Sequence, residues 1–169
     1  MKLGRLEIDL TELKEFVVSA KKNGYASKKE AKREHDGSKT FVFEGGNFHY
    51  TDNYAGSYHA PGSEIVRWQR KEGQRIWQMA YSGGMLQSLW GNEELRNQTF
   101  NFLKEALSHV SSKHPFRGPP AYQNDKDFLY LMNVRGDIKR FSGTELIKNK
   151  ETEKLLFSQD FIGGLVIPK

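Results

Sequence analysis

The chain has 169 residues and no cysteine, and its 26 basic and 21 acidic side chains give a formal net charge of +5. The length suits one domain or two small halves with a shared core, and the lack of cysteine excludes disulfides, thiolate metal sites and cysteine nucleophiles. No apolar run approaches the roughly 18 residues of a membrane helix, and residues 1–5 do not begin a signal peptide. We therefore expect a cytoplasmic protein without a membrane segment.

The first predicted element is a helix that follows Asp9. Apolar residues recur at three- and four-residue steps from Leu10 to Ala20, which places them on one helix face. Asp9 is the expected N-cap, and Glu12 stands three residues later as in a capping box. The helix should end at Asn23-Gly24, because glycine readily adopts the left-handed conformation that closes a helix.

A basic segment, residues 28–38, comes next. Its cations could attract nucleic acid or another anionic partner; the alternative is a solvated loop. In the wider basic stretch from Lys21 to Lys39, Tyr25 is the only aromatic residue, which is few for stacking on single-stranded nucleic acid. The candidate contact residues are Lys28, Lys29, Lys32 and Arg33.

The remaining pattern predicts antiparallel hairpins and one more helix. Residues 40–44 and 47–54 flank Gly45-Gly46, a two-residue turn, and residues 64–69 and 75–81 alternate in polarity. A helix capped by Asn92 is expected to run to about Lys113, before Pro115. Two further hairpins should pair residues 128–134 with 137–141 around Arg135-Gly136, and 144–148 with 155–161. The expected fold class is α+β with antiparallel sheet.

Six short blocks recur in the same order in the two halves of the chain. Leu13-Lys14-Glu15 returns 90 residues later, whereas Tyr81-Ser82-Gly83-Gly84-Met85 matches Phe161-Ile162-Gly163-Gly164-Leu165 at an offset of 80. The offset falls because the first copy contains about eleven additional residues in the basic segment, which we interpret as an insertion.

The repeat predicts one compact domain, residues 1–169, made of two packed pseudo-duplicated units. Residues 9–85 and 92–167 would each contain a helix laid on its own sheet of about four strands. Each unit has a marginal core alone, so the two units should pack together, and a cleft between them is the natural place for a site.

The chain resembles a bacterial and archaeal family known as domain of unknown function 5680. The resemblance rests on Asn23-Gly24-Tyr25-Ala26, Ile76-Trp77-Gln78-Met79-Ala80-Tyr81, Phe116-Arg117-Gly118-Pro119 and Gly163-Gly164-Leu165. Many family members carry an Xre-type helix-turn-helix domain ahead of this one, which implies a sensor or effector-binding role. Because the first helix is expected at Asp9, we expect a stand-alone version of the regulatory part.

Glu64 and Glu145 occupy equivalent positions in the two copies. Across a cleft, two carboxylates could share a proton, bind a cation or divide acid and base roles; alternatively, each accepts hydrogen bonds from a neighbouring turn. Arg117, in a loop rich in glycine and proline, could clamp an anionic ligand or pair with Glu145.

Aromatic residues concentrate between Phe41 and Trp90. Phe48, Tyr50 and Tyr54 share one parity and should line one sheet face, where hydroxyl groups and rings could form a mixed pocket or simply the core. With Trp77 and Tyr81 on the adjacent strands they complete the candidate ligand site. Its residues are Tyr50, Tyr54, Glu64, Trp77, Tyr81, Arg117, Tyr130 and Glu145.

No catalytic or cofactor motif is present. His49 and Asp52 are an odd number of residues apart, so a strand directs them to opposite faces and we expect no metal site. Neither a Gly-x-Ser-x-Gly elbow nor a phosphate-binding loop occurs. Our first hypothesis is a non-catalytic domain that binds a small molecule or a protein partner without a cofactor. An enzyme that uses the cleft carboxylates and tyrosines, and a nucleic-acid contact through the basic segment, are the alternatives.

Overall fold

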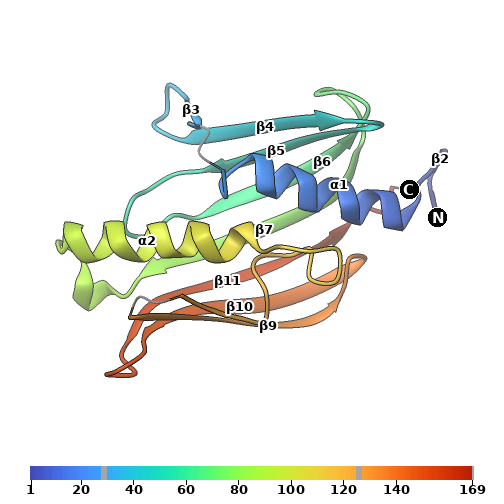
Figure 1. Ribbon diagram of the computed structural model, residues 1–169. Coiled ribbons are helices and arrows are strands. Elements are labelled where there is room, and N and C mark those ends of the chain that lie inside the picture. Colours follow the sequence, from blue (N-terminus) through green and yellow to red (C-terminus); the bar gives the residue numbers. More distant parts are fainter. Residues whose placement is uncertain (28–29, 125–126, 169) are drawn as a thin grey trace.

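The fold of the chain is α+β, as expected, with two helices on one face of a large antiparallel sheet and a separate two-stranded sheet, β1-β2, at the N-terminus (Figure 1). The computed structural model describes residues 1–27, 30–124 and 127–168. The elements are β1 (Lys2–Leu3), β2 (Leu6–Glu7), α1 (Leu10–Asn23), β3 (Lys32–Arg33), β4 (Lys39–Gly45), β5 (Phe48–Tyr54), β6 (Gly62–Trp68), β7 (Arg75–Met85), the 3-10 helix η1 (Gln87–Leu89), α2 (Glu93–Ser108), β8 (Ala121–Gln123), β9 (Phe128–Asp137), β10 (Arg140–Asn149) and β11 (Leu155–Leu165).

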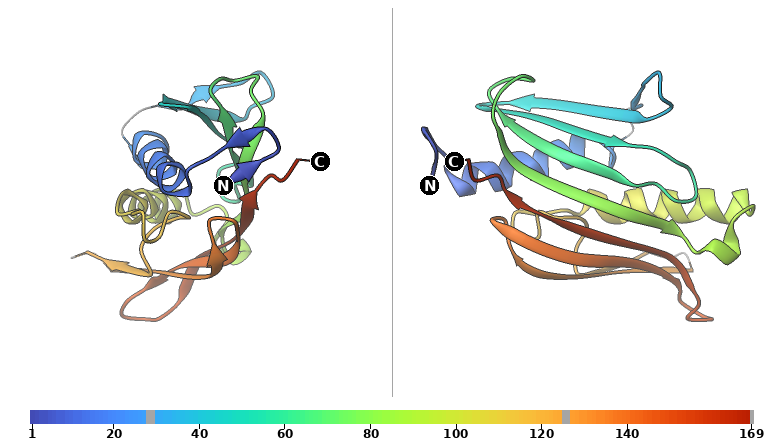
Figure 2. Two further views of the ribbon diagram at one scale, coloured as in Figure 1. Left: turned by 90° about the vertical axis from the view of Figure 1, so that its right-hand side faces the viewer. Right: turned by 180° about the vertical axis from the view of Figure 1, so that it is seen from behind.

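Nine strands form one sheet in the order β3-β4-β5-β6-β7-β11-β10-β9-β8. The two small sheets expected from the sequence are therefore joined edge to edge, through antiparallel pairing of β7 with β11. The helices lie side by side on one sheet face, and in the described part of the chain the other face carries no helix (Figure 2). Neither helix is long and apolar enough to cross a membrane, within the residues that the structure describes.

Helix α1 has the boundaries that its sequence predicts. The Asp9 carboxylate accepts hydrogen bonds from the amides of Thr11 (2.7 Å) and Glu12 (3.3 Å), which satisfies two of the free N–H groups at the helix start. Gly24 follows the last helical residue as predicted, but its φ of −103° is not the expected left-handed conformation. The apolar stripe that includes Leu13 and Phe16 is buried. The helix packs this stripe on β4 and β5.

Helix α2 begins as predicted but ends earlier. The Asn92 side chain accepts a hydrogen bond from the Leu95 amide at 3.0 Å, which confirms the cap. The helix stops at Ser108 rather than near Lys113. Ser108, His109 and two further serines lie close together here, and such residues compete with the backbone for hydrogen bonds and favour turns. Pro115 therefore does not end the helix.

The predicted hairpin around Arg135-Gly136 is wrong. Residues 128–137 form one strand, β9, and residues 140–149 form its hairpin partner, the continuous strand β10. Gly143 does not interrupt β10, because its missing side chain makes room for the ring of Phe161, 2.5 Å from where a Cβ atom would stand. The glycine thus reflects close packing within a strand and not a turn.

The core lies between the helices and the centre of the sheet. Trp77 is fully buried at the start of β7, where its indole N–H donates to the Ile138 carbonyl at 3.2 Å and its ring stacks on Phe141. Trp77 is therefore a core residue and does not line the ligand pocket, contrary to the expectation from the sequence. Its partners come from the second half of the chain, so the core is shared by both halves.

Candidate functional site

A group of charged and polar side chains is buried beneath the helices at the centre of the sheet. We call it the buried charge cluster. Both halves of the chain contribute to it, from α1, β5, β6 and β7 on one side and from the loop after α2, β9, β10 and β11 on the other. Its members are Lys21, Asp52, Glu64, Tyr81, Arg117, Tyr130, Glu145 and Gln159, each less than one-tenth exposed.

Arg117 connects the two halves of this cluster. Its guanidinium donates to Glu145 through Nε (2.9 Å) and contacts the same oxygen through Nη2 (2.7 Å), while Nη1 lies 3.7 Å from Glu64. It also lies over the ring of Tyr81, 5.1 Å from the ring centroid. Burial opposes its charge, but Glu145, Glu64 and Tyr81 together outweigh this effect, so the pKa of Arg117 is raised well above its ordinary value.

Glu145 is saturated by protein donors. Besides Arg117, it accepts hydrogen bonds from the hydroxyl of Tyr130 at 2.8 Å and the amide of Gln159 at 2.7 Å. Tyr130 in turn accepts a bond from the Gly118 amide at 3.0 Å, which fixes the loop that carries Arg117. Burial and the nearby Glu145 raise the pKa of Tyr130 well above its ordinary value. Of the two roles predicted for Arg117, pairing with Glu145 is the one observed.

Glu64 has a corresponding partner in the first half. Lys21 Nζ donates to its carboxylate, and both side chains are buried. Burial lowers the pKa of Lys21, an effect that Glu64 partly offsets. Tyr50 lies against the same carboxylate, and its pKa is raised well above the ordinary value by burial and then by Glu64. Glu64 and Glu145 are thus both engaged by the one guanidinium of Arg117.

Asp52 is the third carboxylate of the cluster. It accepts a hydrogen bond from the Tyr81 hydroxyl at 2.6 Å and is 3% exposed. Burial, and next the negative charge of Glu64, raise the pKa of Asp52 to about 7. The cluster therefore contains three carboxylates and two cations, Lys21 and Arg117, so that it is neutral when Asp52 carries a proton.

A pocket of about 470 Å³ opens onto this cluster, and we call it the cleft pocket. Asp52, Tyr81, Arg117 and Gln159 form its buried part. Tyr25 follows helix α1, and its ring packs edge to face against Tyr54 of β5 with centroids 5.7 Å apart. Helix α2 supplies another wall, with polar and charged residues that include Arg96, Asn97, Asn101 and Lys104, and Lys39 and the loop after β5 complete the lining. The volume is within the range that holds organic ligands of drug size.

Two other hollows are present. One of about 20 Å³ lies beneath the cleft pocket and shares Tyr25, Asp52 and Arg117 with it; it is large enough for a water molecule. The other, about 890 Å³, lies on the helix-free face of the sheet and is lined by side chains such as Ser82, Thr144 and Ile162. It contains none of the ion pairs of the buried charge cluster. We therefore place the candidate site at the cleft pocket.

Most of the predicted site residues come together. Glu64, Tyr81, Arg117, Tyr130 and Glu145 belong to the buried charge cluster, Tyr50 contacts it, and Tyr54 lines the cleft pocket; Trp77 alone does not take part. In the basic segment, Lys28 and Lys29 lie outside the described residues. Lys32 and Arg33 are exposed on β3, and Lys32 pairs with Glu34 at 2.9 Å. A nucleic-acid contact through this segment stays a prediction.

Three members of the buried charge cluster, Lys21, Asp52 and Gln159, are not among the site residues predicted from the sequence. Lys21 resembles a solvated lysine at a helix end, although its spacing from Leu13 and Val17 places it on the apolar face. Asp52 was weighed only as a metal ligand, although it shares the parity of Phe48, Tyr50 and Tyr54 and so had to face the helices. Nothing in the sequence indicates that Gln159 is a buried polar residue, apart from its place in the last predicted strand. No group of three or more potential metal ligands occurs among residues that the structure describes.

Comparison with known proteins identifies one family. A family model described as a domain of unknown function (DUF5680) matches residues 52–166. The match includes every member of the buried charge cluster except Lys21, and all of the sheet from the middle of β5 onward. Neither the curated proteins nor the solved structures contain a match.

Proposed function

We propose that this chain, which belongs to the DUF5680 family, is a non-catalytic domain that binds a small molecule in the cleft pocket. One observation carries the proposal: a pocket of about 470 Å³ whose floor is a network of charged side chains contributed by both halves. Buried charges are costly and persist only where their partners are well placed. A solvent-open pocket above such a network exposes rigid, oriented hydrogen-bonding groups, as ligand recognition requires.

The arrangement of Glu64 and Glu145 favours binding over paired-carboxylate catalysis. A general acid or base needs a free oxygen directed at the reacting group. Glu145 instead accepts bonds from Arg117, Tyr130 and Gln159, and Glu64 is held by Lys21. These carboxylates stabilise the floor of the pocket. An enzyme remains the alternative, with Asp52 and Tyr81 as its most accessible acidic pair.

The proposal includes the duplication of one helix-plus-sheet unit. In its support, β5 and β9 begin 80 residues apart, as do β7 and β11. The strand register shifts after Val66 in one half and after Ile147 in the other, and Gly84 and Gly164 have the same φ of 156°. A crystal structure should superpose α1 with its strands on α2 with its strands in the same order. A different order would contradict the duplication.

The binding function is tested with a thermal-shift screen of small metabolites, charged and uncharged. Asn101→Trp places a large ring in the cleft pocket from an exposed position on α2, whereas Gln98→Trp changes an exposed position of the same helix that does not line the pocket. We expect at least one compound to raise the melting temperature of the wild type and of Gln98→Trp but not of Asn101→Trp. Equal shifts in all three proteins, or no shift in any of them, would contradict the proposal.

The same compound distinguishes binding from catalysis. Mass spectrometry after prolonged incubation with the protein should recover it unchanged. Its conversion at a rate that Asp52→Asn abolishes would establish the enzyme instead.

A further inference from the structure

The mouth of the cleft pocket carries positive charge that no acidic side chain among the described residues pairs with. Lys39, Arg96 and Lys104 line it, and within the described residues none of the three forms an ion pair. Each lies instead over a tyrosine ring: Lys39 over Tyr54 at 5.7 Å, Arg96 over Tyr58 at 5.0 Å and Lys104 over Tyr25 at 5.3 Å. Cation–π contacts orient a cation but leave its charge available to an anion.

At the floor of the cleft pocket, the uncompensated charge is negative. Among the described residues that line the pocket, Asp52 is the only carboxylate. Arg117 is already compensated by Glu145, and Lys21 by Glu64. An ionised Asp52 would therefore present an uncompensated negative charge to any ligand that enters. A proton on Asp52 removes that charge and adds a hydrogen-bond donor.

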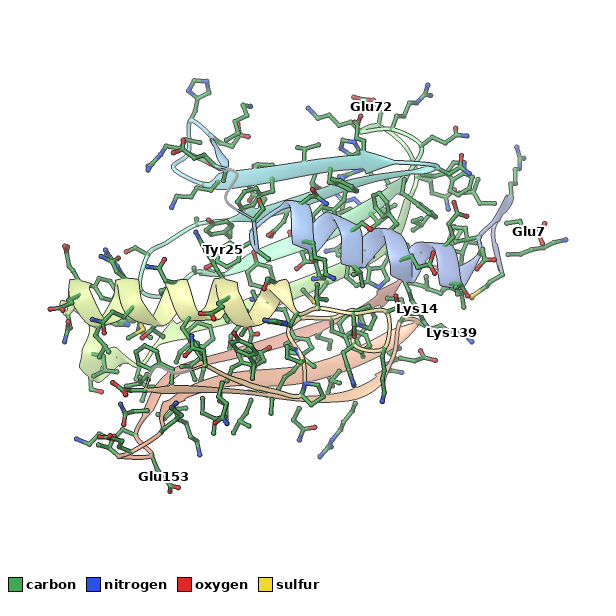
Figure 3. All side chains as sticks on the ribbon, viewed as in Figure 1. Glu7, Lys14, Tyr25, Glu72, Lys139 and Glu153 are labelled. Carbon is green, nitrogen blue, oxygen red and sulfur yellow. The ribbon has the colours of Figure 1, made fainter. Side chains whose placement is uncertain are left out.

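We infer that the cleft pocket binds an organic anion, held at the mouth by Lys39, Arg96 and Lys104, and that Asp52 takes up a proton as the anion binds. The inference rests on the proposed function and specifies its ligand. The ligand's charged group would be a carboxylate, sulfonate or phosphate, and its apolar body would lie along Tyr25, Tyr54 and Phe100. Figure 3 shows Tyr25 beside α2, where the side chains of both helices approach the sheet.

The surroundings of Asp52 set the pH range of this coupling. The charged and titratable groups that face it are Lys21 and Tyr25 from α1 and the turn after it, Lys39 from β4, Tyr50 and Tyr54 from β5, Glu64 from β6, Tyr81 from β7, Arg96 and Lys104 from α2, and Arg117 from the following loop. Burial and then Glu64 raise the pKa of Asp52 to about 7, against the opposing effects of Tyr81, Lys21 and Arg117. A bound anion raises this pKa further, because it disfavours the carboxylate. Affinity should then fall as the pH rises above 7, by up to about tenfold per pH unit.

The first experiment tests the charge of the ligand with two matched probe pairs. 4-Phenylbutyrate is compared with its amide, and naphthalene-2-sulfonate with its sulfonamide, by calorimetric titration. We expect at least one of the two anions to bind at least tenfold more tightly than its uncharged partner. Lys104→Glu should weaken this binding about tenfold, whereas Lys71→Glu, an exposed lysine in the loop between β6 and β7 that does not line the pocket, should not change it. Equal binding within both pairs, or no binding of either anion, overturns the inference.

The second experiment measures the proton. Neither anion titrates between pH 6 and 8, so calorimetry at pH 7 in buffers of different ionisation enthalpy reports proton uptake by the protein alone. We expect about half a proton per anion for the wild type, because Asp52 is already about half protonated at this pH, and close to none for Asp52→Asn. Uptake that persists in Asp52→Asn would assign the proton to another group and overturn the role of Asp52.

Failure of this inference is distinguishable from failure of the proposed function. If an uncharged probe binds as tightly as its anion and Asn101→Trp still blocks it, the pocket binds small molecules but does not select anions. If Asn101→Trp leaves the binding of the anions unchanged, they bind outside the cleft pocket and this inference fails, whereas the thermal-shift screen still decides the proposed function.

Discussion

Arg117 joins two carboxylates that come from strands on opposite sides of the sheet centre. Its bonds to Glu145 and its contact with Glu64 are buried, and Tyr81 covers the guanidinium. Removing one member of such a network leaves the others charged and unpaired in a medium that solvates them poorly. The side chain thus stabilises the fold and shapes the floor of the cleft pocket.

We expect Arg117→Met to lower the free energy of unfolding by about 3–5 kcal/mol. The substitution leaves the buried Glu145 without a cationic partner and removes one of the two cations near Glu64. Urea denaturation followed by circular dichroism measures the effect. Arg140→Met is the matched control, because Arg140 is exposed and forms no ion pair within the described chain, and it should change stability by less than about 0.5 kcal/mol. A loss below about 1 kcal/mol for Arg117→Met would argue against a tightly coupled network.

The raised pKa of Asp52 predicts a dependence of stability on pH. The folded protein holds the proton up to about pH 7, whereas an aspartate in the unfolded chain, with its ordinary pKa of 3.8, releases it much earlier. Between these values the folded state binds more protons, so stability falls as the pH rises. Relative to Asp52→Asn, the wild type should lose up to about 1.4 kcal/mol per pH unit from pH 5 to 7 and change little above pH 8. A difference that is constant over this range would show that Asp52 titrates normally.

At the scale of elements, the continuity of the strands depends on glycines that make room for a neighbour. Gly136 lies within β9 at a φ of 91°, and a Cβ atom there would stand 2.1 Å from the Arg140 carbonyl oxygen. Gly91, before α2, has nearly the same φ, 93°, but nothing within 4 Å of its Cβ position. Substitutions at these two positions therefore distinguish the cost of a positive φ from the cost of a steric clash.

Gly91→Ala should therefore cost only the strain of positive φ, about 1–2 kcal/mol. Gly136→Ala should cost several kcal/mol more, because the backbone of the β9–β10 hairpin must move away from the new methyl group. Thermal denaturation of both variants makes the comparison. Equal losses would mean that the hairpin adapts without strain.

At the scale of the whole molecule, the two halves form a single structure. They share the β7–β11 pairing, the core around Trp77 and the buried charge cluster. Each half alone would expose these surfaces, and a unit of this size has little other core. The sequence interpretation assigns each half its own sheet, whereas the structure has one nine-stranded sheet to which both halves contribute.

We accordingly expect one cooperative unfolding transition. All three tryptophans, Trp68, Trp77 and Trp90, precede α2, and Trp77 packs against Phe141. Their fluorescence therefore reports on the first half and on its contact with the second, whereas far-ultraviolet circular dichroism reports on the whole chain. The two urea transitions should coincide. Separate midpoints would show that the halves unfold independently.

Local features were readable from the sequence because they depend on neighbours along the chain. The caps at Asp9 and Asn92 and the parity of Phe48, Tyr50 and Tyr54 were predicted and are observed. Two of the failed strand predictions have their cause in packing, one across a hairpin and one against a distant ring. Gly136 and Gly143 resemble turn residues in isolation, but the backbone at Arg140 and the ring of Phe161 require glycine there, within strands.

The candidate site likewise depends partly on local sequence features and partly on contacts between distant residues. The paired glycines and the repeated Glu64 and Glu145 suggested a cleft between two copies, but the pattern carries no information on which charges meet. Joining the sheets through β7 and β11 brings Arg117 between the two glutamates and leaves Asp52 as the unbalanced carboxylate. Side-chain periodicity is set by local backbone geometry, whereas the balance of buried charge depends on contacts between residues as far apart as Lys21 and Glu64.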